Sequence, residues 1–353
     1  MLSLTDIERI LTFYTLGKLY GVTQAYRGFV NETAFIQTSA GRFVVRRNHR
    51  RLSEAAHRYR HALINCLVEH AFPTPVLVPT STGDTLLYLD GRWHEIMTYV
   101  HGSDYDPQRP QQLTDIGYTL AQYHRIVQHF PPPAENPGTR YSASSIMALT
   151  ETLTMNDIMG DLYEPLTWYS HRAAQLRSML KDKDYAMLPH LVIHGDIHRD
   201  NLLFEHDHVI ALLDFDQAAY DARIADIADA LVAFTSTKPK NSLMSWGLFQ
   251  GPLDEKQAVR FISAYAHVFP LTPAEIAALP VVVEALWLQG ELGRVISTPE
   301  GAPDYHQSVL DQGRELSTWM QAHSKQLMMQ WNDVNTQAEI ESQKNELEPA
   351  LAA

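Results

Sequence analysis

The sequence predicts an α+β protein in which a small antiparallel sheet precedes a larger, mainly helical part. Five strand-like segments surround one helix before Gly102, and helical periodicity dominates after it. The chain has 353 residues, of which 45% are hydrophobic, so it can bury a core in each of two parts. We expect a sheet domain over 1–101, a helical domain over 102–324 and a polar C-terminal extension over 325–353.

The strands of the first part are predicted from segments rich in β-branched and aromatic residues that turn signals separate. A helix should lie between the third and fourth strands and end before Pro73. Thr5 and Glu8 have the spacing of a capping box, which predicts an earlier helix that ends near Leu16. The strands are expected at Leu19–Tyr26, Thr33–Thr38, Gly41–Arg47, Asp84–Asp90 and Trp93–Tyr99, and the helix at Leu52–His70.

The second part is predicted to be helical except around residues 191–214. Leu113–Val127 has helical periodicity, residues 141–180 are mostly helical, and Thr272 followed by Pro273 is typical of a helix start. A short apolar strand is expected at Leu191–Ile193, and then a hairpin that pairs Asn201–Glu205 with Val209–Asp214. From about Lys325 the polar composition predicts a solvated helix or a frayed tail.

The overall charge disfavours several classes of partner. The formal net charge is −13, which repels nucleic acid and anionic membrane surfaces but is compatible with an amine-bearing substrate. The single cysteine, Cys66, lies in an apolar run and is interpreted as a core thiol in a reducing compartment. No signal peptide or apolar run of membrane-spanning length is evident, so we expect a cytoplasmic protein.

Three polar residues follow the predicted strands of the 191–214 region. Asp196 follows a buried strand, Asn201 precedes the hairpin, and Asp214 ends it, so the three side chains should converge. Phosphoryl transfer needs one carboxylate that accepts a proton from the attacking hydroxyl, and oxygen ligands for Mg²⁺. Asp196 suits the first role, and Asn201 and Asp214 suit the second. The sequence therefore predicts an ATP- and Mg²⁺-dependent kinase.

The same residues carry a family resemblance. His194, Gly195, Asp196, His198 and Asn201 match the His-Gly-Asp-x-His-x-x-Asn catalytic loop of the aminoglycoside phosphotransferase and choline kinase superfamily, and 214–216 matches its metal-binding element. Over about residues 5–320 the chain most resembles bacterial type II homoserine kinases. The resemblance implies a two-lobed, protein-kinase-like fold and a small-molecule hydroxyl as phosphate acceptor. It also implies that Asp196 is the base, that Asn201 and Asp214 bind metal, and that Asp226 braces the loop.

The resemblance extends to the predicted nucleotide-binding part. Asn31 occupies a recurrent position in the loop over the phosphates, and Arg46 stands where kinases place the phosphate-binding lysine of the third strand. Adenine should bind the backbone near Thr98–Val100, with Met97 and Tyr99 nearby, although ordinary core packing explains these two side chains equally well. We favour a phosphate contact for Arg46 over a plain surface arginine.

The acidic partner of Arg46 departs from the family pattern. Many relatives orient this cation with a glutamate on the following helix, but the matching position here is Arg60. Either Glu54 serves instead or the ion pair is absent. His57 and His61 lie one helical turn apart, and we interpret them as a solvated face rather than a metal site.

Other polar residues leave alternatives open. His194 is expected to brace the loop rather than move protons, and His198 to line the cleft. A zinc site made by His194, His198, His206 and His208 is not favoured, because no helix aligns them. Asp216 either touches the metal indirectly or turns the chain. Arg223 and Arg294 could bind a substrate carboxylate, but structural ion pairs are favoured for both.

The acceptor itself is not identified by a motif. Homoserine is the first candidate, and an aminoglycoside, choline or another amino alcohol is the alternative. An arginine near the cleft floor would favour homoserine, whereas a ring of acidic residues would favour a polycation. A nucleotide-binding pseudokinase or regulatory module, suggested by Arg60, is a further alternative of another class. The oligomeric state is not predicted.

Overall fold

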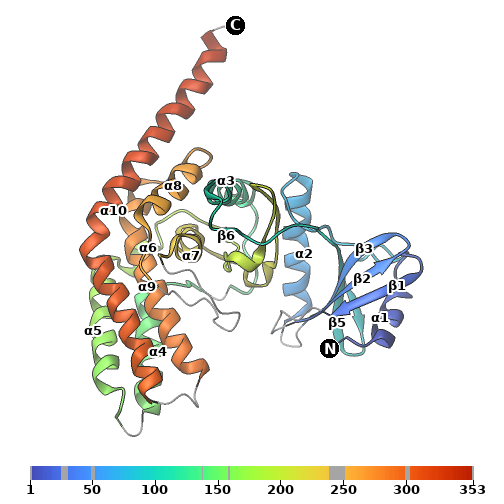
Figure 1. The fold of residues 1–353 in the computed structure, drawn as a ribbon, viewed down its shortest axis with the longest axis horizontal. Coiled ribbons are helices and arrows are strands. Elements are labelled where there is room, and N and C mark those ends of the chain that lie inside the picture. Colours follow the sequence, from blue (N-terminus) through green and yellow to red (C-terminus); the bar gives the residue numbers. More distant parts are fainter. Residues whose placement is uncertain are drawn as a thin grey trace. The chain divides into compact units, whose positions relative to one another are not determined.

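The computed structural model describes residues 2–24, 31–48, 52–136, 138–157, 160–237, 251–298 and 303–351. It divides into two compact units. The sheet unit comprises Met1–Tyr105, Pro133–Glu135 and Asp200–Asp216, and the helical unit comprises Asp106–Pro132, Asn136–Arg199 and Gln217–Ala353. An N-terminal antiparallel sheet and a helical C-terminal part confirm the predicted α+β fold class (Figure 1).

The sheet unit is built on five antiparallel strands in the order β1-β2-β3-β5-β4. Helices α1 and α2 lie on opposite faces of this sheet (Figure 1). The α1 face is apolar, and residues such as Ile7, Ile10, Val45 and Ile96 form its core. The elements are α1 Leu4–Leu11, β1 Leu19–Gln24, β2 Glu32–Thr38, β3 Gly41–Arg47, α2 Glu54–Glu69, β4 Leu87–Leu89 and β5 Arg92–Thr98.

The start of α1 corrects one prediction. The capping box uses Ser3 and Asp6 rather than Thr5 and Glu8, and α1 ends at Leu11 rather than near Leu16. The Ser3 hydroxyl accepts the Asp6 backbone N–H at 3.1 Å, and the Asp6 carboxylate accepts the Ser3 N–H at 2.9 Å. Ser3 with Asp6 and Thr5 with Glu8 both have the spacing of a capping box, and the structure forms the first.

A hairpin completes the sheet unit. Strands β7 (Leu202–Glu205) and β8 (His208–Leu212) pair antiparallel, with a turn at 206–207, as predicted. The backbone of Leu212 donates to Pro73 at 2.8 Å, and Phe204 bridges Ser103. The hairpin is thereby attached to the chain segments that follow α2 and β5.

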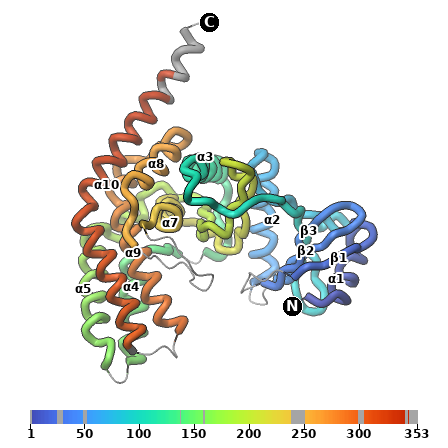
Figure 2. The backbone as a smooth tube through the Cα atoms, viewed as in Figure 1, coloured from blue at the N-terminus to red at the C-terminus, as the bar shows by residue number. Residues whose placement is uncertain are grey.

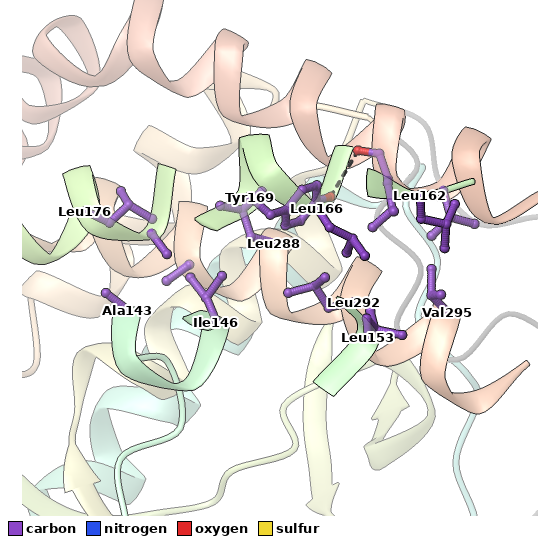
Figure 3. Packing of buried hydrophobic residues seen from close by; sticks show 14 residues of the cluster. Ala143, Ile146, Leu153, Leu162, Leu166, Tyr169, Leu176, Leu288, Leu292 and Val295 are labelled. Carbon is purple, nitrogen blue, oxygen red and sulfur yellow. Dashed lines mark hydrogen bonds between the residues drawn. The ribbon is translucent and has the colours of Figure 1, made fainter. Parts of the chain in front are cut away.

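The helical unit packs its helices around a two-stranded sheet of β6 (His190–Ile193) and β9 (Ala219–Ala222). Helix α3 lies beside α8, and α9 lies beside α10 and α7. In Figure 3, Leu288, Leu292 and Val295 of α9 point toward side chains of α4 and α5. The helices are α3 Pro110–Val127, α4 Ala143–Asn156, α5 Tyr163–Met179, α6 Asp182–Tyr185, α7 Ile224–Thr235, α8 Glu255–Ala266, α9 Pro273–Ser297 and α10 Pro303–Leu351, with 3-10 turns at Arg199–Asn201 and Phe215–Gln217.

The last helix is packed further along its length than its composition predicts. Figure 2 shows α10 as one continuous coil. Leu327, Trp331 and Ala338 are buried, and the Asn335 side chain exchanges two hydrogen bonds with the Leu271 backbone at 2.7 and 3.0 Å. The segment after Lys325 is therefore part of the helical unit at least as far as Ala338. The predicted helix is therefore present, but several of its residues are buried against the rest of the unit rather than solvated.

Helix α9 is the longest apolar segment in the described part of the chain. Within the described residues, it alone has the length and mean hydropathy that a membrane crossing requires. However, 78% of its apolar window is buried inside the protein, as in the core helix of a bundle.

Candidate active site

The sheet unit places the predicted phosphate-binding arginine in a cluster of buried charges. Arg46 is only 7% exposed, which rules out a plain surface arginine. Its guanidinium donates to Asp214 at 3.1 Å and to Asp216, and it lies 3.6 Å from Glu95. Arg60 of α2 donates to both Glu95 and Asp216. We call Arg46, Arg60, Glu95, Asp214 and Asp216 the arginine cluster.

Glu95 is the acidic partner that sequence reasoning missed. It lies directly opposite Arg46 in the register of β3 and β5, so the two side chains share the face that α2 covers. Burial alone would raise its pKa, but Arg60, a hydrogen bond from His61 and Arg46 lower the pKa well below its usual range. Glu54 was the wrong candidate, because it pairs with Arg58 on the exposed side of α2 at 2.7 Å.

The histidines of α2 do not form a solvated face. His57 and His61 are both buried, at 0% and 4% exposure, so that expectation was wrong. The Nε2 of His61 bonds Glu95 at 2.6 Å and its Nδ1 bonds Thr85 at 2.8 Å. Burial, and then the neighbouring Arg60 cation, lower the pKa of His57 to about 4, so its ring is neutral at physiological pH. His57, Arg60 and His61 are all buried on α2. Arg60 and His61 both bond Glu95, so this face of the helix is turned toward the sheet.

Asp216 is held as an anion by the cluster. Burial would raise its pKa, but Arg46 and Arg60 outweigh burial and lower it. The Asn31 amide also donates to Asp216 at 2.6 Å. Asn31 and Arg46, the two residues predicted to lie near the phosphates, therefore meet at Asp216. The structure gives Asp216 partners that neither alternative for it had anticipated.

Asp214 and Asn201, the candidate metal ligands, lie together in the same unit. The Leu213 backbone donates to the Asn201 carbonyl at 2.9 Å, which holds Asn201 beside the end of the hairpin. The Asp214 side chain is 43% exposed, unlike that of Asp216. Asp214 has a φ of 61°, a left-handed conformation that is uncommon outside glycine and is typical of functional sites. A group of three or more His, Cys, Asp or Glu side chains able to hold a metal is absent from the described residues.

Met97 and Tyr99 lie at the end of β5. Met97 is opposite Val44 in the β3–β5 register and bridges Leu77. The Tyr99 backbone N–H donates to Arg42 at 3.2 Å, and its ring lies 3.9 Å beneath the Arg42 guanidinium. These contacts fix both residues in the sheet and leave their proposed place beside adenine as a prediction.

The helical unit holds the 194–199 loop, which carries the candidate base. Asp226, at the first turn of α7, accepts the backbone N–H groups of His194 and Gly195, both at 2.7 Å. The Nε2 of His124 lies 3.1 Å from the same carboxylate. Burial would raise the pKa of Asp226, but the His124 hydrogen bond and nearby charges lower it. An ionised, buried carboxylate thus ties the loop to α7 and α3.

His194 has the contacts of a brace. Its side chain is fully buried, and its Nδ1 accepts the Asp196 backbone N–H at 3.2 Å. Gly195 has a φ of 77°, and a Cβ there would overlap the Gln217 carbonyl. Glycine is therefore required between the brace and the candidate base.

Asp196 itself is partly open to solvent. Its side chain is 41% exposed and lies 3.4 Å from His198. Burial raises its pKa, but His198, His194 and Arg140 together lower it below the usual value. The carboxylate is therefore ionised at neutral pH and can accept a proton.

Two arginines that could have bound substrate have structural partners. Arg223 forms a two-pronged pair with Glu275 at 2.6 and 2.8 Å and is 2% exposed. Arg294 lies 3.4 Å from Glu291, one helical turn earlier on α9. Both arginines therefore form the ion pairs within the fold that were the favoured interpretation.

The chain matches known proteins over most of its length. A homoserine kinase of Beijerinckia indica is 27% identical over 304 residues, which cover 85% of this chain and 89% of the relative. An aminoglycoside phosphotransferase structure from Alicyclobacillus acidocaldarius aligns with a TM-score of 0.67 at 19% identity, covering 92% and 96% of the two chains. The structure of an amicoumacin kinase in complex with AMP-PNP, Ca²⁺ and Ami aligns with a TM-score of 0.66 at 14% identity, covering 89% and 92% of the two chains.

A family model supplies the assignment. The model of the phosphotransferase enzyme family matches residues 21–279, a span that contains the arginine cluster and the 194–199 loop. The relatives and structural neighbours are small-molecule kinases. This chain therefore belongs to the phosphotransferase enzyme family and is a small-molecule kinase.

Proposed function

We propose that this protein transfers the γ-phosphoryl group of ATP, in the presence of Mg²⁺, to the hydroxyl group of a small molecule, with homoserine as the first candidate acceptor. The observation that carries the proposal is Asp196, an ionised and partly exposed carboxylate on a loop that Asp226 fixes through two backbone bonds. The homoserine kinases among the relatives support the choice of acceptor. A reaction that consumes ATP also suits the predicted cytoplasmic location.

Asp196 would act as the general base. Its carboxylate would accept the proton of the acceptor hydroxyl while that oxygen bonds to the γ-phosphorus. The bond from the γ-phosphorus to the bridging oxygen breaks, and ADP leaves with the electron pair. His194 would brace the loop rather than transfer this proton, because its side chain is fully buried and its Nδ1 accepts the backbone N–H of Asp196.

The residues of the sheet unit suit a nucleotide with its metal. Asp214 offers a partly exposed carboxylate beside the buried Arg46, and Asn201 can add an amide oxygen. Magnesium usually takes few protein ligands and keeps phosphate and water oxygens, so this small donor set fits it. When bound, the metal would neutralise charge on the phosphates. Arg46 would contact the phosphates, Asn31 would lie near them, and Met97 and Tyr99 would lie near adenine.

A screen of ATP consumption tests the proposal. The purified protein is assayed with Mg²⁺ and ATP against homoserine, choline, aminoglycosides and small amino alcohols, and the phosphorylated product is identified by mass spectrometry. We expect one of these hydroxyl compounds to be phosphorylated, homoserine first among them. Silence across the panel, in a protein that binds ATP, would instead support a regulatory nucleotide-binding module.

Two variants test the assigned roles. Asp214→Ala should lose the Mg²⁺ dependence of ATP binding, and unchanged Mg²⁺-dependent affinity would remove Asp214 as a ligand. Arg46→Ala should bind MgATP more weakly but adenosine normally. Equal losses for the two ligands would show that Arg46 supports the fold rather than the phosphates.

A further inference from the structure

Arg140 in the helical unit lies beside the 194–199 loop and has no carboxylate partner. Its backbone N–H donates to Asp221 at 2.8 Å, which fixes its place before α4. A Cβ built on Gly195 would lie 2.7 Å from its Nη1, so the guanidinium rests against the residue that precedes Asp196. Across the described residues, no carboxylate oxygen lies within 4.0 Å of this guanidinium.

Two buried arginines of this unit, Arg172 and Arg223, differ from the half-buried Arg140 in this respect. Arg172 forms a two-pronged pair with Glu284 at 2.5 and 2.8 Å, and Arg223 forms the same kind of pair with Glu275. These pairs neutralise the charge within the fold. Among the described residues no hydrogen bond of the Arg140 guanidinium is found, and a planar guanidinium with available donors is suited to a carboxylate or phosphate.

Tyr141 connects Arg140 to a buried acid. The Tyr141 hydroxyl donates to Oδ1 of Asp229 on α7, and the Arg140 guanidinium carbon lies 5.6 Å from the centre of the Tyr141 ring. The other carboxylate oxygen of Asp229, Oδ2, is buried and has no hydrogen-bond partner within the described chain. Burial raises the pKa of Asp229 to about 7, against the opposing effect of Arg140. Burying a carboxylate oxygen such as Oδ2 costs free energy unless a donor forms a hydrogen bond with it.

Both groups lie close enough to Asp196 to affect its charge environment. Arg140 lowers the pKa of Asp196, and the charge of Asp196 raises the pKa of Asp229. Arg140, Tyr141, Asp196 and Asp229 all belong to the helical unit. Arg140, whose guanidinium packs against Gly195, therefore lies beside the candidate base. The Asp229 carboxylate, which has one oxygen without a hydrogen-bond partner in the described chain, bonds the neighbouring Tyr141.

We propose that Arg140 binds the carboxylate of the phosphate acceptor and that Asp229 binds its ammonium group, so that the acceptor is a zwitterionic hydroxy amino acid. This inference rests on the proposed kinase function, because the acceptor hydroxyl must reach Asp196. An ammonium group beside Oδ2 supplies the missing donor and favours the ionised form of Asp229. Tyr141, which directly follows Arg140 in the chain, donates to the other oxygen of Asp229.

Three acceptors that differ in one charge each test this inference. Homoserine carries both charges, aminopropanol lacks the carboxylate, and gamma-hydroxybutanoate lacks the amine. We expect the wild-type protein to use homoserine with the highest kcat/KM, at least about tenfold above either analogue, since each lost charged hydrogen bond has roughly that effect.

Variants assign the two charges separately. Arg140→Met should lower kcat/KM for homoserine by about 10- to 100-fold and have little effect with aminopropanol, which has no carboxylate to lose. Arg140→Lys should recover part of the loss. Asp229→Asn should lower kcat/KM for homoserine and aminopropanol but have little effect with gamma-hydroxybutanoate. A variant that has lost a binding contact should lose kcat/KM only with the acceptors that carry the matching charge. A variant with a general structural defect should lose kcat/KM equally with all three acceptors.

Matched controls come from an exposed ion pair of the same unit. Arg177 and Asp182 lie 3.1 Å apart and are both more than half exposed. Arg177→Met and Asp182→Asn should leave the ratios between acceptors unchanged. Circular dichroism establishes whether each variant is folded. If Arg140→Met does not fold, the measurements are made with Arg140→Lys instead.

The outcomes distinguish this inference from the proposed function. Equal losses on all three acceptors in Arg140→Met and Asp229→Asn would overturn the zwitterion site while leaving the kinase activity intact. A wild-type protein that prefers aminopropanol or an aminoglycoside to homoserine would do the same. A wild-type protein that phosphorylates no acceptor would overturn both proposals.

Discussion

The arginine cluster of the sheet unit and the 194–199 loop of the helical unit fix their candidate functional residues by different means. The cluster uses ion pairs among five charged side chains from α2, β3, β5 and the end of the β7–β8 hairpin. The loop instead uses its own backbone N–H groups, which a single buried carboxylate, Asp226, accepts. Charge balance therefore positions the first site, whereas local backbone geometry positions the second.

This difference determines how each site should respond to substitution. Removing a charge from the cluster leaves other buried charges uncompensated, so stability should suffer most. Changing the exposed carboxylate of the loop removes chemistry and leaves the bracing bonds intact, so turnover should suffer most. The four predictions below test this contrast, from the largest expected effect to the smallest.

Asp196→Asn should separate chemistry from folding most clearly. We expect kcat to fall by about 10²- to 10⁴-fold, because the amide cannot accept the hydroxyl proton. The KM for ATP and the midpoint of urea unfolding should stay near the wild-type values, since the Asp196 side chain is partly exposed. Steady-state kinetics and urea unfolding measure both, with Asp182→Asn as the exposed control. Turnover close to wild type would exclude Asp196 as the base.

Glu95→Gln should be the most destabilising change in the cluster. Arg46, Arg60 and His61 would lose their shared anion, and we expect the free energy of unfolding to fall by about 3–5 kcal/mol at neutral pH. Equilibrium urea unfolding measures this, with Glu54→Gln on the exposed side of the same helix as the matched control.

The pH dependence of Glu95→Gln provides a second measurement. The pKa of Glu95 is lowered in the folded state, so its stabilising effect is present above its unfolded pKa and is lost as the pH falls below it. The variant should therefore lose less stability than the wild type between neutral and acid pH. Parallel pH profiles would show that the Glu95 charge does not stabilise the cluster.

Asp226→Asn should affect both stability and turnover. An amide keeps one acceptor oxygen for the backbone N–H groups of His194 and Gly195 and loses the charge, so we expect a loss of about 1.5–3 kcal/mol. Turnover should fall because the loop that carries Asp196 is held less firmly. If the variant is less stable but its turnover equals that of the wild type, Asp226 supports only the fold. The contrast between the two sites would then be weaker than proposed.

Glu54→Gln should have the smallest effect. Among the described residues Glu54 pairs only with Arg58, and both side chains are about half exposed. We expect a change within about 0.5 kcal/mol in stability and no change in the KM for ATP. A raised KM for ATP would restore Glu54 as the partner of Arg46 in the working enzyme.

The sequence predicted the local part of the structure well. The five strands and α2 were placed to within a few residues, because alternation and turn residues encode them locally. The loop motif is likewise contiguous, so His194, Gly195, Asp196 and Asn201 could be read together. Asp226 was found because the family pattern carries it on the following helix.

Long-range pairing was not accessible in the same way. Glu95 meets Arg46 only because β5 lies beside β3, although β4 precedes β5 in the chain. Without that strand order, Arg60 looked like a missing glutamate rather than a second cation that shares Glu95. His57 and His61 were misassigned for the same reason, since the polarity of their helix face depends on what the sheet places beneath it. Arg140 and Asp229 carried no motif at all.

The packing of α10 has a consequence for how the protein is made. Trp331 is fully buried and Asn335 completes the hydrogen bonds of Leu271, yet both are translated well after α8 and α9. When α9 has left the ribosome during synthesis, α10, which packs against it in the finished protein, has not yet been made. The nascent helical unit must therefore keep an apolar helix shielded until α10 emerges, which makes this interval of synthesis the point at which a chaperone would be needed.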